Sequence, residues 1–312
     1  MNCWLEDRKK RFQNLFTEEE LVNPHMAVVK PNELDLTWLK KASMDYLASI
    51  VNYPEYKNEE DLLKEFEVCH DIGFVDNITP TGMILPKRNT SLHYNAFLKA
   101  FYKLVMNTEV APKLKSCHTP AHLRVKWPLA VEKDLNRPRH APEDLHFDSW
   151  SGYSSQSMTF LLGILGDVSG NRVRYFQPKE SYDEDWLLNK PKPEFLLDHY
   201  DVIDYTPKYG EIVILDTCVL HQTYRDENCG IRFSIDNLFL SKEELAWPEN
   251  IEKHREDELT DPMLLKDIGT ECFYFCTDKN DEKKDTKGGA IDPTNYDFYT
   301  RPKNITYRIY DE

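Results

Sequence analysis

Six short runs of sequence decide the fold, and they read LRVKW (123–127), HFDSW (146–150), SMTFLLGIL (157–165), RVRYF (172–176), EIVILD (211–216) and IRFSIDNLFL (231–240). Each run is rich in β-branched and aromatic residues and lacks helical periodicity, which is typical of β-strands. No long helical pattern separates them. This arrangement predicts an antiparallel barrel or sandwich of the jelly-roll type, an architecture that also protects the exposed edges of its sheets.

The first third of the chain has a different pattern. Apolar residues recur near a 3.6-residue period in the segments 34–51 and 61–70, and a third such segment runs from 91 to 106. This spacing predicts amphipathic helices. The fold class that we expect is therefore mostly β with flanking helices, built around a jelly-roll (cupin-like) core.

A single domain accommodates these parts, because 312 residues lie within the size range of one elaborated barrel. We expect a helical N-terminal support at 1–120, the jelly-roll core at 121–240 and a C-terminal extension at 241–312. The connection 178–209 is rich in charge and proline. It is predicted to be an insertion over one mouth of the barrel.

The composition limits the partners of the protein. A net charge of −15 opposes binding to nucleic acid or to an anionic membrane, because like charges repel. The N-terminal residues MNCWLEDRKKRFQNLF contain no apolar core of signal-peptide length, and no segment approaches the roughly 18 apolar residues of a spanning helix. Seven scattered cysteines without a C-x-x-C pair favour reduced thiols. We therefore expect a cytoplasmic protein with a small-molecule substrate and no membrane or nucleic-acid partner.

The triplet His146-Phe147-Asp148 offers two metal ligands. Side chains two apart on an extended segment point to the same side, so His146 and Asp148 supply a nitrogen and an oxygen to one ion while Phe147 faces the other way. A ferrous site of this kind needs a second imidazole and keeps positions open for a cosubstrate and O₂. His221, which lies just beyond the apolar strand 212–215, is the best candidate for the third ligand.

A possible anion clamp follows eleven residues later. Arg232 and Ser234 share one face of a strand, because strand side chains alternate, and the neighbours of Arg232 are apolar. A buried guanidinium offers a bidentate fork to a carboxylate, and a nearby hydroxyl adds one hydrogen bond. This is the chemistry required to hold the distal carboxylate of 2-oxoglutarate.

These residues together resemble the signature of the iron(II)/2-oxoglutarate-dependent dioxygenases, and HFDSW with the later Gly-Glu-apolar run and histidine is similar to the phytanoyl-CoA-hydroxylase-like branch. The resemblance covers about 123–240. It implies a double-stranded β-helix, Fe(II), 2-oxoglutarate and O₂ as cofactors, and oxidative decarboxylation to succinate coupled to attack on an unactivated C–H bond. It also implies roles for five residues: iron ligands His146, Asp148 and His221, and cosubstrate anchors Arg232 and Ser234.

The reaction outcome stays partly open. Related halogenases have Gly or Ala at the position of Asp148 so that chloride binds the iron, which leaves hydroxylation, desaturation or oxidative ring closure for this chain. A hydroxylase of another molecule and a catalytically idle cupin-like metal-binding barrel are the alternatives, although an idle barrel has no use for a cosubstrate clamp. Asp216 is expected to orient the strand end or to support a ligand rather than to bind metal.

Over its whole length the chain also resembles the kainoid synthases, which close the pyrrolidine ring of kainic acid from an N-prenylated glutamate. This resemblance implies secondary metabolite biosynthesis and an acidic amino-acid derivative as substrate, which needs local cations in so acidic a protein. Strand alternation puts two basic residues on one face in each of two runs, and we expect at least one pair to line the pocket. The alternative is that both faces are solvated. The four candidates are Arg124, Lys126, Arg172 and Arg174.

Overall fold

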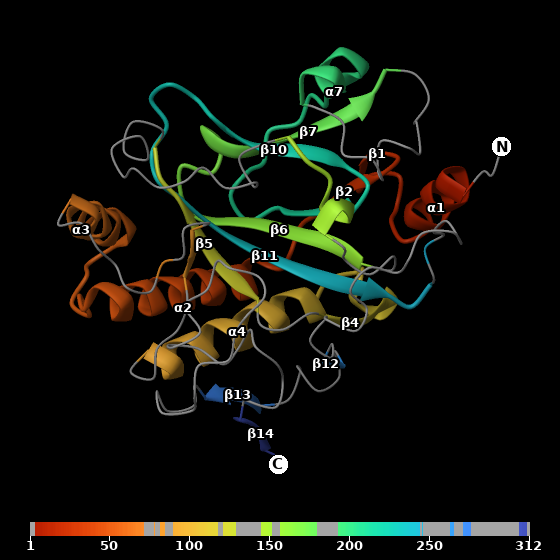
Figure 1. Ribbon diagram of the computed structural model, residues 1–312. Coiled ribbons are helices and arrows are strands. Elements are labelled where there is room, and N and C mark those ends of the chain that lie inside the picture. The colour runs from red at the N-terminus through yellow and green to blue at the C-terminus, as the bar shows by residue number, and fades with distance from the viewer. Residues whose placement is uncertain are drawn as a thin grey trace, which may run out of the picture.

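The computed structural model describes residues 4–71, 78, 82–84, 90–117, 121–128, 145–151, 157–179, 193–243 and 245, together with short strands at 263–264, 271–275 and 306–310. Two antiparallel sheets lie face to face, and helices cover the free side of the larger one (Figure 1). A separate two-stranded sheet near the C-terminus pairs β13 (Glu271–Phe275) with β14 (Thr306–Tyr310).

Within the described residues, the larger sheet has nine strands. Seven follow one another in the order β1-β2-β9-β6-β11-β4-β12, while β5 pairs with both β11 and β3. Its central strands β6, β9 and β11 are the apolar runs that the sequence singles out. The strands are β1 (Leu21–Asn23), β2 (Met26–Val29), β3 (Met83–Ile84), β4 (Leu114–Cys117), β5 (His122–Lys126), β6 (Ser157–Gly166), β9 (Ile212–Asp216), β11 (Arg232–Ser241) and β12 (Met263–Leu264).

The smaller sheet has the order β10-β7-β8, with β10 spanning Leu220–Arg225, β7 spanning Asn171–Pro178 and β8 spanning Tyr200–Val202. An isolated bridge between His146 and His221 adds the segment before β6 to its edge. From β6 to β11 the chain passes between the sheets in the order larger, smaller, smaller, larger, smaller, larger. This winding is that of a double-stranded β-helix, so the predicted fold class is confirmed.

The helices lie where the periodicity predicts them. α2 (Glu33–Val51) and α4 (Ser91–Met106) pack on each other beneath the larger sheet, and α3 (Glu59–Asp71) lies at one end (Figure 1). Asn32 caps the start of α2 with its side-chain oxygen, which accepts hydrogen bonds from two free backbone N–H groups. None of the described helices is both long enough and apolar enough to cross a membrane.

The core has two main layers, which define the two faces of the larger sheet. Phe160, Phe233 and Ile235 pack against the helices in one cluster. Val213 and Leu215 belong to another cluster that lies between the sheets and includes Tyr175 of β7 together with Met26 of β2. We call the side of each sheet that faces the other sheet its inner face.

Parts of the N-terminus and of the 178–209 connection are more regular than the sequence indicates. α1 (Trp4–Gln13) precedes β1 and β2, and β2 pairs with β9 inside the larger sheet. The connection contains α7 (Pro193–His199) and β8, which extends the smaller sheet, while residues 180–192 lie outside the described part. Short elements of this kind give too few periods to be predicted from sequence.

Candidate metal centre

His146 and His221 face each other across the bridge that closes the smaller sheet. The His146 amide donates to the His221 carbonyl at 2.9 Å, and the His221 amide donates to the His146 carbonyl at 2.9 Å. Such a reciprocal pair sends both side chains to the same side of the sheet, and the ring centroids lie 4.3 Å apart. Phe147 points the other way, fully buried in a cluster with Phe176 and Leu220, as the alternation predicts.

Asp148 reaches the histidines from a turn. The sequence predicts an extended segment here, but a short 3-10 helix, Asp148–Ser151, begins directly after Phe147, and the Trp150 amide donates to the Phe147 carbonyl at 3.1 Å. The Asp148 Oδ1 atom nevertheless lies 3.9 Å from His146 Nε2 and 3.6 Å from His221 Nε2. Thr159 of β6 donates its hydroxyl hydrogen to Asp148 Oδ2 at 2.5 Å. The second carboxylate oxygen is thus held while the first faces the two imidazoles.

The three side chains fit a divalent metal ion. A set of possible donor atoms, one from each side chain, lies within 4.8 Å of one another. His221 Nδ1 lies 2.9 Å from the Val219 carbonyl, which only accepts hydrogen bonds, so Nδ1 carries a hydrogen and Nε2 is the nitrogen on the side of Asp148. Two imidazoles and one carboxylate are the donor set that suits ferrous iron and leaves coordination positions open.

Arg232 is buried on the inner face of β11. It is 4% exposed, its Nη1 donates to the Asn171 carbonyl at 3.0 Å, and among the described residues its Nε has no hydrogen-bond partner. Burial, only partly offset by nearby Tyr175, lowers the pKa of Arg232 to about 10. Ser234 shares this face and is also buried. A buried guanidinium with an unsatisfied N–H group suits an anionic ligand.

Two of the four predicted substrate residues share the inner face with Arg232. On β5, Lys126 pairs in register with Arg232, and Arg124 pairs with Ser234. Arg124 is bound by a carboxylate of the protein itself, since its Nε and Nη2 donate to the two oxygens of Asp236 at 3.0 Å and 2.9 Å. Lys126 is 3% exposed. This pair therefore lines the space between the sheets, but Asp236 neutralises one of its charges.

The other two predicted substrate residues lie on the opposite side of the smaller sheet. On β7, Tyr175 packs between the sheets, so Arg172 and Arg174 project outward. Both guanidinium groups stack on the outer ring of Tyr224, at 4.7 Å and 3.3 Å from its centroid, and Arg172 also pairs with Asp226 at 2.9 Å. Of the two basic pairs, the one on β7 therefore lies on the side of the smaller sheet away from His221, which faces inward with Tyr175. Alternation shows which residues share a face, but only the packing shows which face is inside.

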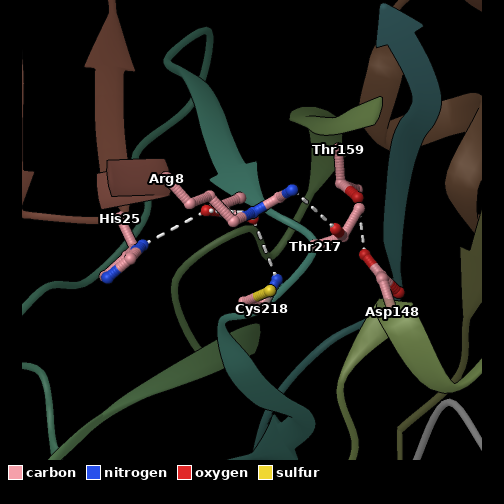
Figure 2. A network of polar contacts seen from close by, with 7 residues as sticks. Arg8, His25, Asp148, Thr159, Thr217 and Cys218 are labelled. Carbon is pink, nitrogen blue, oxygen red and sulfur yellow. Dashed lines mark hydrogen bonds and ion pairs between the residues drawn. The ribbon is translucent and has the colours of Figure 1, made fainter. Parts of the chain in front are cut away.

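Asp216 supports the site without joining the metal ligands. It accepts hydrogen bonds from Arg8 of α1, and its carboxylate also contacts His25 (Figure 2). Burial alone would raise the pKa of Asp216, but the charges and hydrogen bonds of Arg8 and His25 hold that pKa well below its usual range. The sequence gives no sign of Arg8 or His25. Thr159 does have a sequence signal, because it is a polar residue within a largely apolar strand.

No protein-family model and no curated protein matches the chain. Solved structures do match, at low identity. The 2-oxoglutarate and 5-hydroxyectoine complex of EctD from S. alaskensis is 13% identical, with 74% of this chain and 77% of that chain covered and a TM-score of 0.38. The non-heme alpha ketoglutarate dependent carbocyclase SnoK from nogalamycin biosynthesis is 11% identical, with 72% and 84% covered and a TM-score of 0.38. An N-substituted L-amino acid dioxygenase from Burkholderia ambifaria is 16% identical, with 72% and 85% covered and a TM-score of 0.35.

Proposed function

We propose that this protein is an iron(II)- and 2-oxoglutarate-dependent oxygenase that acts on a C–H bond of a small molecule. The observation that carries the proposal is the convergence of His146, Asp148 and His221, with possible donor atoms within 4.8 Å of one another. Arg232 supports it as a second, independent feature, because it lies on the inner face with an unsatisfied Nε. A triad of metal ligands alone would suit several classes of metalloenzyme. A buried arginine that can bind a carboxylate favours the class that uses 2-oxoglutarate as a cosubstrate.

Each residue has a separate task in this proposal. His146, Asp148 and His221 would hold the iron, and Thr159 and the Val219 carbonyl orient two of these side chains. Arg232 and Ser234 take the distal carboxylate of 2-oxoglutarate. Bound iron supplies the redox chemistry by which O₂ and 2-oxoglutarate oxidise a substrate C–H bond, with succinate and CO₂ as coproducts.

The identity of the substrate is a narrower proposal than the type of reaction, and fewer contacts support it. An acidic amino-acid derivative fits the two cations Arg124 and Lys126 on the inner face, although Arg124 already forms an ion pair with Asp236. Oxidative cyclisation of an N-prenylated glutamate to a kainoid rests on the whole-chain sequence resemblance. No contact among the described residues selects that substrate over another small molecule. Hydroxylation of a different small molecule therefore remains the alternative outcome of the same site.

Succinate release tests the proposal. The protein is loaded anaerobically with Fe(II) and 2-oxoglutarate, O₂ is admitted, and succinate is measured with and without candidate substrates, an N-prenylated glutamate among them. We expect slow succinate formation without substrate and faster formation with the correct one. His221→Ala is the control that should form none. A wild-type protein that binds iron but never forms succinate would favour the idle metal-binding barrel instead.

A further inference from the structure

A buried ion pair joins the N-terminal helix to the region behind the metal ligands. The side chains of Arg8 on α1 and Asp216 at the end of β9 are both 0% exposed. Arg8 Nε lies 2.8 Å and 2.9 Å from the two Asp216 oxygens, and Arg8 Nη2 lies 2.8 Å from Oδ1. Figure 2 draws Arg8 in the same view as Thr159 and Asp148. The ion pair fastens the N-terminal helix to the end of β9.

The Asp216 carboxylate shapes the turn that follows β9. Its Oδ1 accepts a hydrogen bond from the Cys218 amide at 3.1 Å, and the Asp216 carbonyl accepts one from the Val219 amide at 2.9 Å. An aspartate that bonds the amide two residues later stabilises a tight turn in this way. Arg8 Nη2 also donates to the Thr217 hydroxyl at 3.2 Å. Arg8 thus contacts two consecutive residues of the turn 216–219.

The same turn contacts the segments of two proposed iron ligands. The Thr217 carbonyl accepts the Ser149 amide at 3.0 Å, directly after Asp148. The Val219 carbonyl accepts His221 Nδ1 at 2.9 Å, which fixes the imidazole orientation. A displacement of the turn would therefore move a carboxylate ligand and an imidazole ligand together.

Arg8 is the residue on which this arrangement depends most. A buried carboxylate keeps its charge only when a cation and hydrogen bonds compensate for lost hydration. His25 Nδ1 also approaches Asp216 Oδ2, at 3.2 Å, but the Arg8 guanidinium makes the shorter contacts and reaches both oxygens. Without Arg8, the buried Asp216 carboxylate would lose its cation, and the side chain that accepts from the Cys218 amide would no longer be held in place.

We propose that Arg8 is a positioning residue for the metal centre, which it serves by fixing the turn 216–219 that sets Asp148 and His221. The inference rests on the proposed function, since it requires that the triad binds a metal ion. Arg8 touches neither the metal nor the substrate. Binding linkage is reciprocal, so if Arg8 raises the metal affinity, metal binding must tighten α1 against the barrel by the same factor.

The affinity for cobalt(II) shows whether Arg8 positions the metal ligands or only stabilises the fold. The metal-free full-length chain is titrated with Co²⁺ and the visible absorption of the ion is followed, for the wild type and for Arg8→Met, Arg8→Lys and Arg11→Met. Arg11 lies on the same helix with a 43% exposed side chain and pairs with Asp7, so it is the matched control. We expect Arg8→Met to bind Co²⁺ at least about tenfold more weakly, as is usual for groups behind metal ligands. Arg8→Lys should restore part of the loss, and Arg11→Met should match the wild type.

The outcomes are distinguishable. If Arg8→Met is folded by circular dichroism, melts at a lower temperature and still binds Co²⁺ with wild-type affinity, Arg8 is only structural and the inference fails. If the wild type itself binds no Co²⁺, the proposed metal function fails, and the inference fails with it.

Hydrogen exchange covers the case in which Arg8→Met does not fold. In the wild type, saturating Co²⁺ should slow amide exchange in α1 by at least about tenfold, the factor expected for the metal affinity, while exchange in α3 at the other end of the sheet should not change (Figure 1). Equal exchange in α1 with and without bound Co²⁺ would overturn the inference.

Discussion

Two buried arginines, Arg8 and Arg232, differ in what surrounds them. Arg8 lies against both oxygens of Asp216. Arg232 donates to a backbone carbonyl, and within the described residues its Nε meets no acceptor. A buried cation paired with a carboxylate holds parts of the chain together, whereas one that lacks an anion is costly until a ligand supplies it. We therefore expect the Arg8 pair to contribute to the stability of the fold, and Arg232 to contribute to the binding of an anionic ligand.

The largest change in stability should come from breaking the ion pair between Arg8 and Asp216. Asp216→Ala leaves the Arg8 guanidinium buried without a carboxylate, and we expect the free energy of unfolding to fall by about 3–5 kcal/mol. Urea denaturation of the metal-free protein measures it. Arg232→Met should change the same quantity by less than about 1 kcal/mol, because it removes an uncompensated buried charge. Equal losses in the two variants would abolish the distinction between the two arginines.

For the binding of 2-oxoglutarate, the Arg232 variant should lose more than the variant that breaks the Arg8–Asp216 pair. Arg232→Met removes the clamp, and we expect a loss of about 2–5 kcal/mol in cosubstrate binding, measured by calorimetry on the Co²⁺-loaded protein without O₂. Arg172→Met removes a cation from the outer face of the smaller sheet and is the matched control, with binding unchanged. Wild-type affinity in Arg232→Met would place the cosubstrate clamp on another residue.

A smaller effect is expected at the hydroxyl that orients Asp148. Thr159→Val keeps the shape of the side chain but removes the donor to Asp148 Oδ2, so Co²⁺ affinity should fall by about 10–100-fold. Thr159→Ser retains the hydroxyl and should stay near the wild type. If valine and serine bind Co²⁺ equally well, the hydrogen bond does not orient the ligand.

The smallest effect concerns acid. The pKa of Asp216 is depressed in the folded protein, so its contribution to stability is complete above the unfolded aspartate pKa of about 3.9 and is lost as the pH falls toward the folded value. Between about pH 5 and pH 3 the wild type should lose about 1 kcal/mol more than Asp216→Asn in urea denaturation. Parallel curves for the two proteins would mean that Asp216 has an ordinary pKa.

The sequence predicts the strands and the triad for physical reasons. An H-x-D triplet brings two ligands to one side of an extended chain, and His146 does keep that alternation. The same alternation correctly places Arg232 and Ser234 on one face of β11. It also places Asp236 on that face, where its carboxylate binds Arg124. The alternation of side chains along a strand depends only on neighbouring residues, so a short stretch of sequence is enough to predict it.

What the sequence could not predict depends on pairing over long distances. Arg8 meets Asp216 across 208 positions, and nothing in the helix 4–13 marks that residue as different from its exposed neighbour Arg11. The runs LRVKW and RVRYF have the same alternation, yet the basic face of β5 is inside and that of β7 is outside. The difference arises because β5 pairs with β11 in the larger sheet and β7 with β10 in the smaller one.

An anaerobic spectral titration tests the central claim most directly. Fe(II) is added to the metal-free protein in the presence of 2-oxoglutarate, and the visible charge-transfer absorption of a chelated iron–2-oxoacid complex is recorded. The wild type should develop this absorption with one equivalent of iron, while His221→Ala and Arg232→Met at the same concentrations should not. Absence of the absorption in the wild type, or its full retention in His221→Ala, would contradict the assignment of His146, Asp148 and His221 as the iron site.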